Sequence, residues 1–306
     1  MRSGFGLQVR LLSAYIRRTP WLVGKGYITG RYLNPVLRAH PIRRVVRTRF
    51  GTRVDVDTHD LIQRYLYMFG VWEPHMTRWL QERLKPGDTF IDVGANIGYY
   101  SVLAAQLVGD GGQVVAVEAS SAFHQKLQQH VRLNGYENVR AVNGAVSDER
   151  KNLTFVLASS SNMGANSIVP YDGPAESSFE VEAFPLDELV DAAEISTARV
   201  IKIDVEGAEG SVVRGMIPML DKLRRDCEIT VEVTPDRMAQ LGDSAEELMK
   251  TMRDHGFHAY RLANEYSPES YVAALRGKRA IPVRWRGPVV EESDLIFSRV
   301  DAESLP

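Results

Sequence analysis

The 306-residue chain has one cysteine, Cys227, and no long apolar run. A single cysteine excludes an internal disulfide and a metal site built from several cysteines, so we expect Cys227 to be a small buried hydrophobic residue. No stretch reaches the roughly 18–20 apolar residues that a membrane-spanning helix needs. Arg10, Arg17 and Arg18 interrupt the apolar stretches near the N-terminus and make them a poor signal-peptide core. These absences predict a cytoplasmic globular protein.

Acidic residues are missing from the first part of the chain. The first one is Asp55, whereas twelve of the 37 Lys and Arg residues precede residue 54. The formal net charge of −2 therefore hides a basic segment followed by an acidic remainder. We predict a basic N-terminal helical extension or cap at residues 1–50 and one domain at residues 51–306. The extension has three interpretations: a cap on the substrate side, a surface for anionic lipid that gives peripheral membrane contact, or an arm for nucleic acid.

Strand and helix patterns alternate regularly from residue 89 onward. Apolar runs typical of strands occur at 89–93, 113–118, 139–146, 200–205, 228–233, 257–262 and 294–300, with helical segments between most of them. These runs are apolar on both faces, as in a sheet that helices cover on both sides. The pattern predicts one doubly wound α/β domain.

The first of these strands continues into a glycine loop, Phe-Ile-Asp-Val-Gly-Ala-Asn-Ile-Gly at residues 90–98. Gly94 lets the chain turn sharply and approach a ligand, and Gly98 lets the following helix pack against the strand. Doubly wound folds bind ligands at the carboxyl ends of their strands. We therefore expect a nucleotide-type cofactor here; a plain strand-to-helix turn is the alternative.

Acidic residues near the loop favour S-adenosylmethionine over a dinucleotide. Glu118 ends the next strand, where its carboxylate can accept hydrogen bonds from both ribose hydroxyls. Asp92 would repel a pyrophosphate but suits the ammonium group of a methionine moiety. The loop also lacks the Gly-x-Gly-x-x-Gly spacing of dinucleotide sites. Asn143, at the end of the third strand, could bind adenine; a turn or helix-cap role is the alternative.

Charged side chains interrupt the next two strands. In Val-Ile-Lys-Ile-Asp-Val-Glu-Gly-Ala-Glu at residues 200–209, Lys202 and Asp204 point to one face. Glu232 is equally unusual in the strand that follows, because buried charges are costly unless they are paired. We expect Asp204, Glu206 and Glu232 at the floor of the transfer site. A buried Lys202–Glu232 pair that holds the sheet together is a compatible alternative.

These motifs, together with residues 70–74 (Gly-Val-Trp-Glu-Pro), 85–88 (Lys-Pro-Gly-Asp) and 145–148 (Ala-Val-Ser-Asp), resemble the FkbM family of S-adenosylmethionine-dependent methyltransferases. The resemblance covers roughly residues 50–300 and leaves out the basic segment. It implies a class I methyltransferase fold: a Rossmann-like, seven-stranded, mostly parallel sheet with an antiparallel last strand. It also implies O-methylation of a sugar, a glycolipid or a natural-product hydroxyl, with N-methylation of peptide side chains as the alternative.

The resemblance also assigns site residues. Those expected at the cofactor are Glu73, Asp92, Gly94, Ala95, Asn96, Gly98, Glu118, Ala119, Asn143, Gly144, Ala145 and Asp204. Glu73 is expected near the methionine end, with a helix-start role as the alternative. Methyl transfer to a hydroxyl needs alignment and a base, and the candidates are Asp204 first, then Glu206 and Glu232.

Other polar residues receive weaker assignments. The loop at residues 159–167 is rich in Ser and Asn, and we expect Ser161 and Asn162 to touch the acceptor; a solvated connector is the alternative. Asp204 and Glu206 could bind Mg²⁺, but nothing indicates it, so no metal is predicted. We expect four histidines at the surface or at helix ends: His75, His124, His255 and His258.

The expected acceptor is a hydroxyl-bearing small molecule or a glycan, with a peptide as the alternative. We predict no nucleic-acid partner, because no Asn-Pro-Pro-aromatic motif follows the fourth strand. An RNA-binding methyltransferase and a non-catalytic cofactor-binding protein are the remaining alternatives.

Overall fold

The computed structural model describes residues 2–19, 21, 23–157, 166–167, 177–275, 277 and 280–305. Their contacts form two compact units. The N-terminal unit draws its described residues from 2–78 and 264–277, and the sheet unit draws its own from 79–263 and 280–305. The boundary at residue 50 stays a prediction; a β-hairpin with strands at Arg43–Arg47 and Arg53–Asp57 passes through this position.

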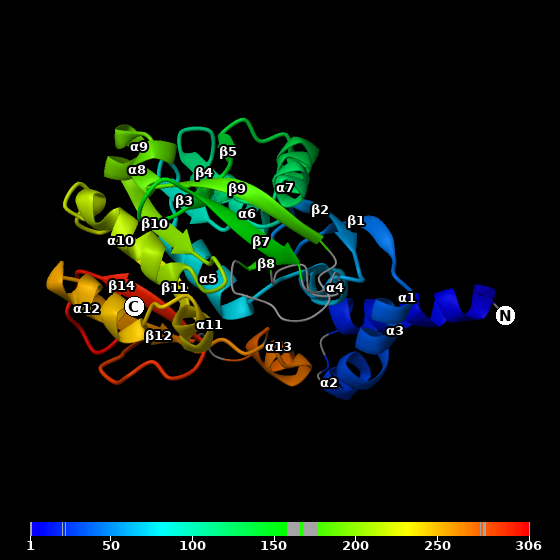
Figure 1. Cartoon of the computed structure of the whole chain (residues 1–306). Coiled ribbons are helices and arrows are strands. Elements are labelled where there is room, and N and C mark those ends of the chain that lie inside the picture. Colours follow the sequence, from blue (N-terminus) through cyan, green and yellow to red (C-terminus); the bar gives the residue numbers. More distant parts are fainter. Residues whose placement is uncertain are drawn as a thin grey trace. The chain divides into compact units, whose positions relative to one another are not determined.

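The N-terminal unit is mainly helical (Figure 1). Its elements are α1 (Arg2–Arg18), α2 (Lys25–Tyr27), the π-helix η1 (Ile28–Leu33), α3 (Asn34–Ala39), β1 (Arg43–Arg47), β2 (Arg53–Asp57), α4 (Leu61–Phe69), the start of α5 (Pro74–Arg83), and α13 (Pro268–Ala274). The basic segment is thus helical over much of its length, as expected.

Aromatic packing brings α13 into this unit. The ring of Tyr271 lies 4.7 Å from that of Tyr65 and 5.2 Å from that of Phe69, between ring centroids. Trp72 stacks on Tyr266 at 5.4 Å. Residues that are far apart in the sequence therefore form one apolar cluster, which the sequence pattern did not predict.

The surface of the N-terminal unit carries large exposed apolar side chains, among them Leu7, Leu11, Trp21, Val23 and Tyr27. Among the described residues, no helix is long and apolar enough to cross a membrane.

The sheet unit is built on an eight-stranded sheet. In spatial order its strands are β13 (Val283–Arg284), β12 (His258–Leu262), β14 (Ser293–Ser298), β11 (Glu228–Val233), β10 (Ala198–Ile203), β3 (Thr89–Val93), β4 (Gln113–Glu118) and β5 (Val139–Asn143). The strands from β11 to β5 are parallel, and β14 runs antiparallel to β11 and β12. This confirms the Rossmann-like sheet with its antiparallel last strand. The expected seven strands are joined by the two-residue edge strand β13.

Helices cover both faces of this sheet (Figure 1). They are α6 (Tyr99–Val108), α7 (Ser121–Asn134), α8 (Leu186–Leu189), α9 (Ala192–Thr197), α10 (Glu209–Leu220), α11 (Pro235–Gln240) and α12 (Ala245–Asp254), with the end of α5. Ile91 and Val93 share one apolar cluster with Met216 of α10. Ala116, on the opposite face, packs against Leu127 of α7. Both faces are therefore buried, as the apolar strands predicted.

A second sheet contains four strands in the order β6 (Ala145–Val146), β9 (Ser177–Phe184), β7 (Lys151–Leu157) and β8 (Asn166–Ser167). The sequence indicated only short strand-like pieces in this region. Ser161 and Asn162, the predicted acceptor contacts, lie outside the described residues, so their assignment stays a prediction.

Close helix packing on this second sheet can be tested at Gly215 of α10. A Cβ atom added there would lie 2.2 Å from the carbonyl oxygen of Ser147, which follows β6. We expect Gly215→Ala to lower the free energy of unfolding by about 1–3 kcal/mol, because the helix must move away. Urea denaturation measures this. Gly111→Ala is the matched control, since it adds a methyl group to open space; equal stability of the two variants would contradict the packing.

Candidate active site

The glycine loop packs directly on the end of β10. The amides of Gly94 and Ala95 both donate to the Val117 carbonyl, at 3.0 Å. Gly94 has a φ of 81°, and an added Cβ would lie 1.8 Å from the carbonyl oxygen of Asp204. Only glycine fits here, because both the backbone conformation and the space exclude a side chain.

The second glycine has a different role from the one expected. Gly98 has a φ of 79°, and an added Cβ would lie 2.8 Å from Cγ of Leu127. Leu127 belongs to α7, so Gly98 allows α6 and α7 to approach each other, whereas the sequence suggested packing of a helix on the strand. Asn96 between the two glycines also adopts the left-handed region, with a φ of 52°.

Asp92 is a buried acid with one unused oxygen. It is 1% exposed, and its Oδ2 accepts a hydrogen bond from Ser101 Oγ at 2.6 Å. Oδ1 has no hydrogen-bond partner among the described residues. Burial raises the pKa of Asp92, against the opposing effects of Lys202 and Ser101. A buried acceptor without a donor is costly, so Oδ1 is suited to a ligand that donates a hydrogen bond.

Glu118 at the end of β4 is also buried, at 7% exposure. Its Oε2 accepts from the Asn96 amide at 2.7 Å, and its Oε1 accepts from the Ser120 amide at 2.8 Å. Burial raises the pKa of Glu118 to about 7. Each carboxylate oxygen keeps capacity for a second donor, such as a ribose hydroxyl.

Asn143 stabilises the neighbouring loop. Its Nδ2 donates to the carbonyls of Glu118 and Ala119, at 2.8 and 3.0 Å, and its Oδ1 accepts from Ser121 at 2.8 Å. The Gly144 amide donates to the Glu118 carbonyl at 3.1 Å, and Ala145 begins β6. Asn143 thus uses its side-chain amide hydrogens within the chain. These bonds support the loop, which agrees with the turn role that the sequence analysis gave as the alternative to adenine binding.

Asp204 follows β10 and forms an ion pair with Lys202. Lys202 Nζ lies 2.6 Å from Asp204 Oδ2 and 5.0 Å from the centre of the Tyr100 ring. Burial raises the pKa of Asp204, but the charge of Lys202 and the hydrogen bonds that Asp204 shares with Glu232 and Lys202 outweigh it, so the pKa lies below its usual value. Asp204 is therefore ionised at neutral pH.

Three carboxylates meet at the ends of β10 and β11. Asp204, Glu206 and Glu232 each place one oxygen within 4.8 Å of the others. Glu206 adopts a left-handed φ of 59° and forms an ion pair with Arg237. The three oxygens could hold a divalent cation, but the positive charges of Lys202 and Arg237 oppose one.

Glu209 is a buried acid that sequence reasoning does not single out. It is fully buried, its Oε1 accepts from the Gly207 amide at 2.8 Å, and its Oε2 accepts from Thr234 Oγ1 at 3.1 Å. Burial raises its pKa to about 7. Glu209 thus ties the loop after β10 to the residue before α11. Its only signal in the sequence is its place as the third acid of Asp-Val-Glu-Gly-Ala-Glu.

Other predicted residues lie elsewhere. Glu73 belongs to the N-terminal unit, where its Oε1 accepts from the Tyr266 hydroxyl and its amide donates to the Tyr271 hydroxyl, both at 2.9 Å. Its role at the cofactor stays a prediction. Cys227 is buried, as expected. Three of the four histidines lie near helix ends: His75 in α5, His124 in α7 and His255 directly after α12. The fourth, His258, begins β12.

Comparison with known proteins decides the family. A family model described as the methyltransferase FkbM domain matches residues 92–259, which is more than half of the chain. The chain belongs to the FkbM methyltransferase family. This membership confirms the resemblance found in the sequence. It also confirms that the chain contains a methyltransferase domain whose cofactor is S-adenosylmethionine.

Relatives of this FkbM chain are distant. It is 26% identical over 221 residues to hexuronic acid methyltransferase AglP of Haloferax volcanii, covering 71% of the chain and 87% of AglP. It is 23% identical over 153 residues to a protein-L-isoaspartate O-methyltransferase of Methanococcus aeolicus, covering 49% of the chain and 62%, less than two thirds, of that protein. A solved FkbM methyltransferase from Methylobacillus flagellatus is similar at 15% identity and a TM-score of 0.38, covering 78% of this chain and 52% of that one.

The residues at the strand ends fit S-adenosylmethionine. This cofactor carries a cationic sulfonium, an ammonium and two ribose hydroxyls. The loop region offers the unused Oδ1 of Asp92, the buried carboxylate of Glu118 and the close backbone approach at Gly94. Negative charge at a site for a cation is electrostatically favourable.

Because Glu209 is buried, we expect its carboxyl group to make the stability of the fold depend on pH. A carboxyl whose pKa is raised on folding stabilises the fold fully below its unfolded pKa, and this contribution is lost as the pH rises through about 7. Glu209→Gln keeps the shape of the side chain but cannot ionise, so the variant does not lose stability as the pH rises. We expect the variant to exceed the wild type in stability by roughly 3 kcal/mol above pH 7.

Urea denaturation at pH 5 and pH 8 measures this difference. The exposed change Glu246→Gln is the matched control and should leave the pH dependence unchanged. If the stability of Glu209→Gln changes with pH as that of the wild type does, the buried carboxyl of Glu209 is not the cause of the pH dependence.

Proposed function

We propose that the chain transfers the methyl group of S-adenosylmethionine to a hydroxyl of a sugar-containing acceptor. The observation that carries this proposal is the contact between the glycine loop and Asp204. The Asp204 amide donates to the Val93 carbonyl at 3.0 Å, and Gly94 leaves no space for a Cβ beside the Asp204 carbonyl. Asp204, the carboxylate that we assign to the methyl acceptor, therefore lies next to the proposed cofactor loop.

The cofactor contacts follow from the free acceptors. We assign the unused Oδ1 of Asp92 to the ammonium group and the carboxylate of Glu118 to the ribose hydroxyls. The backbone of Gly94, Ala95 and Asn96 supplies the close approach. A second group of residues supports the loops around the adenine: Gly98, Ala119, Asn143, Gly144 and Ala145.

Asp204 is the group that we assign to the acceptor. The bound cofactor supplies a methyl group that is already electrophilic, so the chain mainly has to align the hydroxyl and accept its proton. As the oxygen–carbon bond forms and the carbon–sulfur bond breaks, the hydroxyl proton passes to the ionised carboxylate of Asp204 and then to water. Glu206 and Glu232 lie within reach of the same site, but Arg237 neutralises Glu206.

The sugar class rests on AglP. Its name gives hexuronic acid as its acceptor, and the aligned region covers 87% of its length. A hexuronic acid bears hydroxyls and a carboxylate, so either oxygen type is available for methylation. The ionised carboxylate of Asp204 favours a hydroxyl, because a hydroxyl must lose its proton during methyl transfer, whereas an acceptor carboxylate is already ionised and needs no base.

A transfer assay with labelled S-adenosylmethionine tests this acceptor class. The panel contains uronic-acid oligosaccharides, neutral oligosaccharides and isoaspartyl peptides. We expect label on an oligosaccharide, and we expect it to survive mild alkali, because an ether is stable where a methyl ester is hydrolysed. Alkali-labile label, or label on the peptides alone, would contradict a sugar-hydroxyl acceptor.

Asp92→Asn tests the cofactor contact. Replacing the carboxylate removes a charge-assisted hydrogen bond to the ammonium, and we expect about 10–100-fold weaker binding of S-adenosylmethionine. Isothermal titration measures this, with NAD as the ligand that should not bind. The exposed change Asp110→Asn is the charge-matched control. Full affinity in Asp92→Asn would remove Asp92 from the cofactor site.

Asp204→Asn separates catalysis from binding. The variant keeps the shape but cannot accept the hydroxyl proton, so we expect a turnover about 10²–10⁴-fold lower. Its affinity for S-adenosylmethionine should stay within about threefold of wild type, because its role is on the acceptor side. Turnover equal to wild type on the acceptor found in the panel would exclude Asp204 from the mechanism.

A further inference from the structure

Helix α1 of the N-terminal unit has two apolar sides. Val9 and Ile16 are 2% and 1% exposed, on the side where α1 packs against α4 and η1. Leu7 and Leu11, which lie one turn apart, are 57% and 61% exposed. The period of 3.6 residues per turn places these leucines on the side of the helix opposite Val9 and Ile16. Folding of the unit therefore buries one apolar side of α1 and leaves the other in contact with solvent.

The turn that follows α1 extends its exposed side. Tyr15, one turn after Leu11, donates from its hydroxyl to the Val23 carbonyl at 2.6 Å. Lys25 holds the end of the turn, because its Nζ donates to a carbonyl of α1 at 2.7 Å. Val23 is 82% exposed and Trp21 is 67% exposed. Four exposed residues make up what we call the α1 surface: Leu7, Leu11, Trp21 and Val23.

The N-terminal unit is positively charged around the α1 surface. Its described residues, in 2–78 and 264–277, contain fourteen Lys and Arg against six Asp and Glu. The six acids lie at residues 55–73 and 265–269, and none is in α1, in α2 or between them. The excess of positive charge along the chain therefore includes the helix that carries the exposed leucines.

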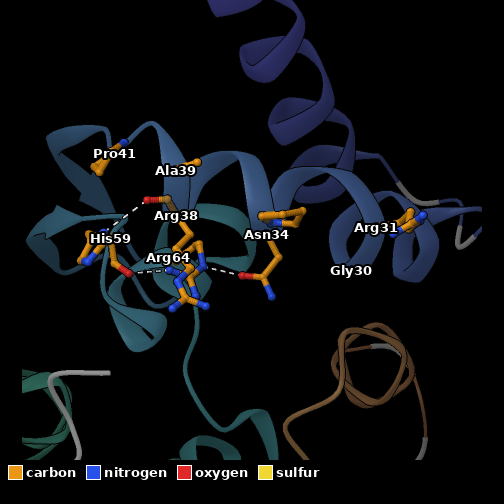
Figure 2. Close-up of a pocket in the computed structure, with 9 residues that line it drawn as sticks. Gly30, Arg31, Asn34, Arg38, Ala39, Pro41, His59 and Arg64 are labelled. Carbon is orange, nitrogen blue, oxygen red and sulfur yellow. Dashed lines mark hydrogen bonds between the residues drawn. The ribbon is translucent and has the colours of Figure 1, made fainter. Parts of the chain in front are cut away.

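Some arginines of this unit support its fold. Arg64 is 4% exposed, and it donates to the His59 carbonyl at 2.6 Å and to Asn34 Oδ1 (Figure 2). Arg17 donates to the Tyr67 carbonyl at 3.1 Å. Both guanidinium groups are thus used to hold backbone and side chains of the unit together.

Two other arginines lie beside the exposed leucines. Arg10 and Arg18 are exposed, and neither forms an ion pair or a side-chain hydrogen bond with the part of the chain that the structure describes. Arg10 follows Leu7 by three residues, and Arg18 follows Leu11 by seven. Both spacings keep side chains on the same side of a helix. The exposed side of α1 therefore combines apolar and cationic groups.

We propose that the α1 surface binds a membrane that contains anionic lipid. Leu7, Leu11 and Trp21 enter the boundary between headgroups and acyl chains, and Arg10 and Arg18 contact the lipid phosphates. Leucine and tryptophan on one side of a helix, with arginines beside them, are the composition of helices that lie in this boundary. The contact is separate from methyl transfer and does not depend on the proposed function.

Charge and apolar area together favour lipid over two other partners. A nucleic acid would pair with the arginines but would leave the leucines exposed to water. A second copy of the chain would cover the leucines, but a symmetric interface would bring Arg10 and Arg18 against the same arginines of the other copy. Anionic lipid suits both kinds of side chain.

Vesicle sedimentation of the full chain tests the proposal. The vesicles consist of phosphatidylcholine alone, or of phosphatidylcholine with phosphatidylglycerol, at low and at high salt. We expect the wild type to bind the vesicles with phosphatidylglycerol more tightly. We also expect salt to weaken this binding, because salt screens the attraction between the arginines and the lipid.

Leu7→Gln with Leu11→Gln removes apolar area from the α1 surface. Both side chains are exposed, so the change leaves the core intact. We expect vesicle binding to weaken about tenfold or more, because less apolar area leaves water. Ile281→Gln with Val290→Gln is the matched control, since it changes two exposed apolar residues of the sheet unit, and it should bind as the wild type does.

Arg10→Gln with Arg18→Gln removes the charges beside the leucines. We expect about tenfold weaker binding to vesicles with phosphatidylglycerol, because each basic residue near an anionic surface adds to the attraction. Lys222→Gln with Arg225→Gln is the charge-matched control, since it changes two exposed basic residues of the sheet unit. S-adenosylmethionine binding should be equal in the wild type and all four variants, which shows that they are folded.

Four results would overturn the proposal. The first is no binding of the wild type to vesicles with phosphatidylglycerol at low salt. The second is full binding by the leucine variant, or equal losses in the arginine variant and its control, which would show non-specific charge attraction. The third is a wild-type dimer that the leucine changes convert to a monomer, which would assign the surface to a second copy. The fourth is a gel shift of a mixed-sequence RNA without vesicle binding, which would assign the basic segment to nucleic acid.

Discussion

The close packing of Gly94 on the backbone of Asp204 is the contact on which the site depends. No side chain fits between them, since an added Cβ would lie 1.8 Å from the Asp204 carbonyl oxygen. The packing fixes the ends of β3 and β10 together, and each end carries an acid. Asp92 lies beside the loop that we assign to the cofactor, and Asp204 is the carboxylate that we assign to the acceptor. In the proposed reaction, one backbone contact therefore holds the two assigned sites together.

Charge then divides the roles of these acids. Lys202 compensates Asp204, and Arg237 compensates Glu206. Within the part of the chain that the structure describes, one buried oxygen of Asp92 has no hydrogen-bond partner, and Glu118 accepts hydrogen bonds from backbone amides. The acids with unused acceptor capacity lie at the glycine loop, where a cationic cofactor with two hydroxyls would use it. In the proposed reaction, the compensated acids would serve the acceptor hydroxyl, which needs an ionised group that is held in place.

The sheet and the glycine loop could be predicted from the sequence because their signals are local. Apolar strand runs, Gly94 and the acids at the strand ends all occur within short windows, and the structure places them at one sheet edge. Long-range contacts could not be predicted in this way. Tyr271 joins the N-terminal unit through packing on Tyr65, from residues about two hundred positions away in the chain. The contact of Gly98 with Leu127 likewise depends on how two helices cross.

Cofactor binding by the acids at the glycine loop is best tested by a crystal structure of the chain with S-adenosylmethionine. We expect the ammonium group within hydrogen-bond distance of Asp92 Oδ1, directly or through one water, and both ribose hydroxyls on Glu118. A cofactor bound away from these two carboxylates would contradict it.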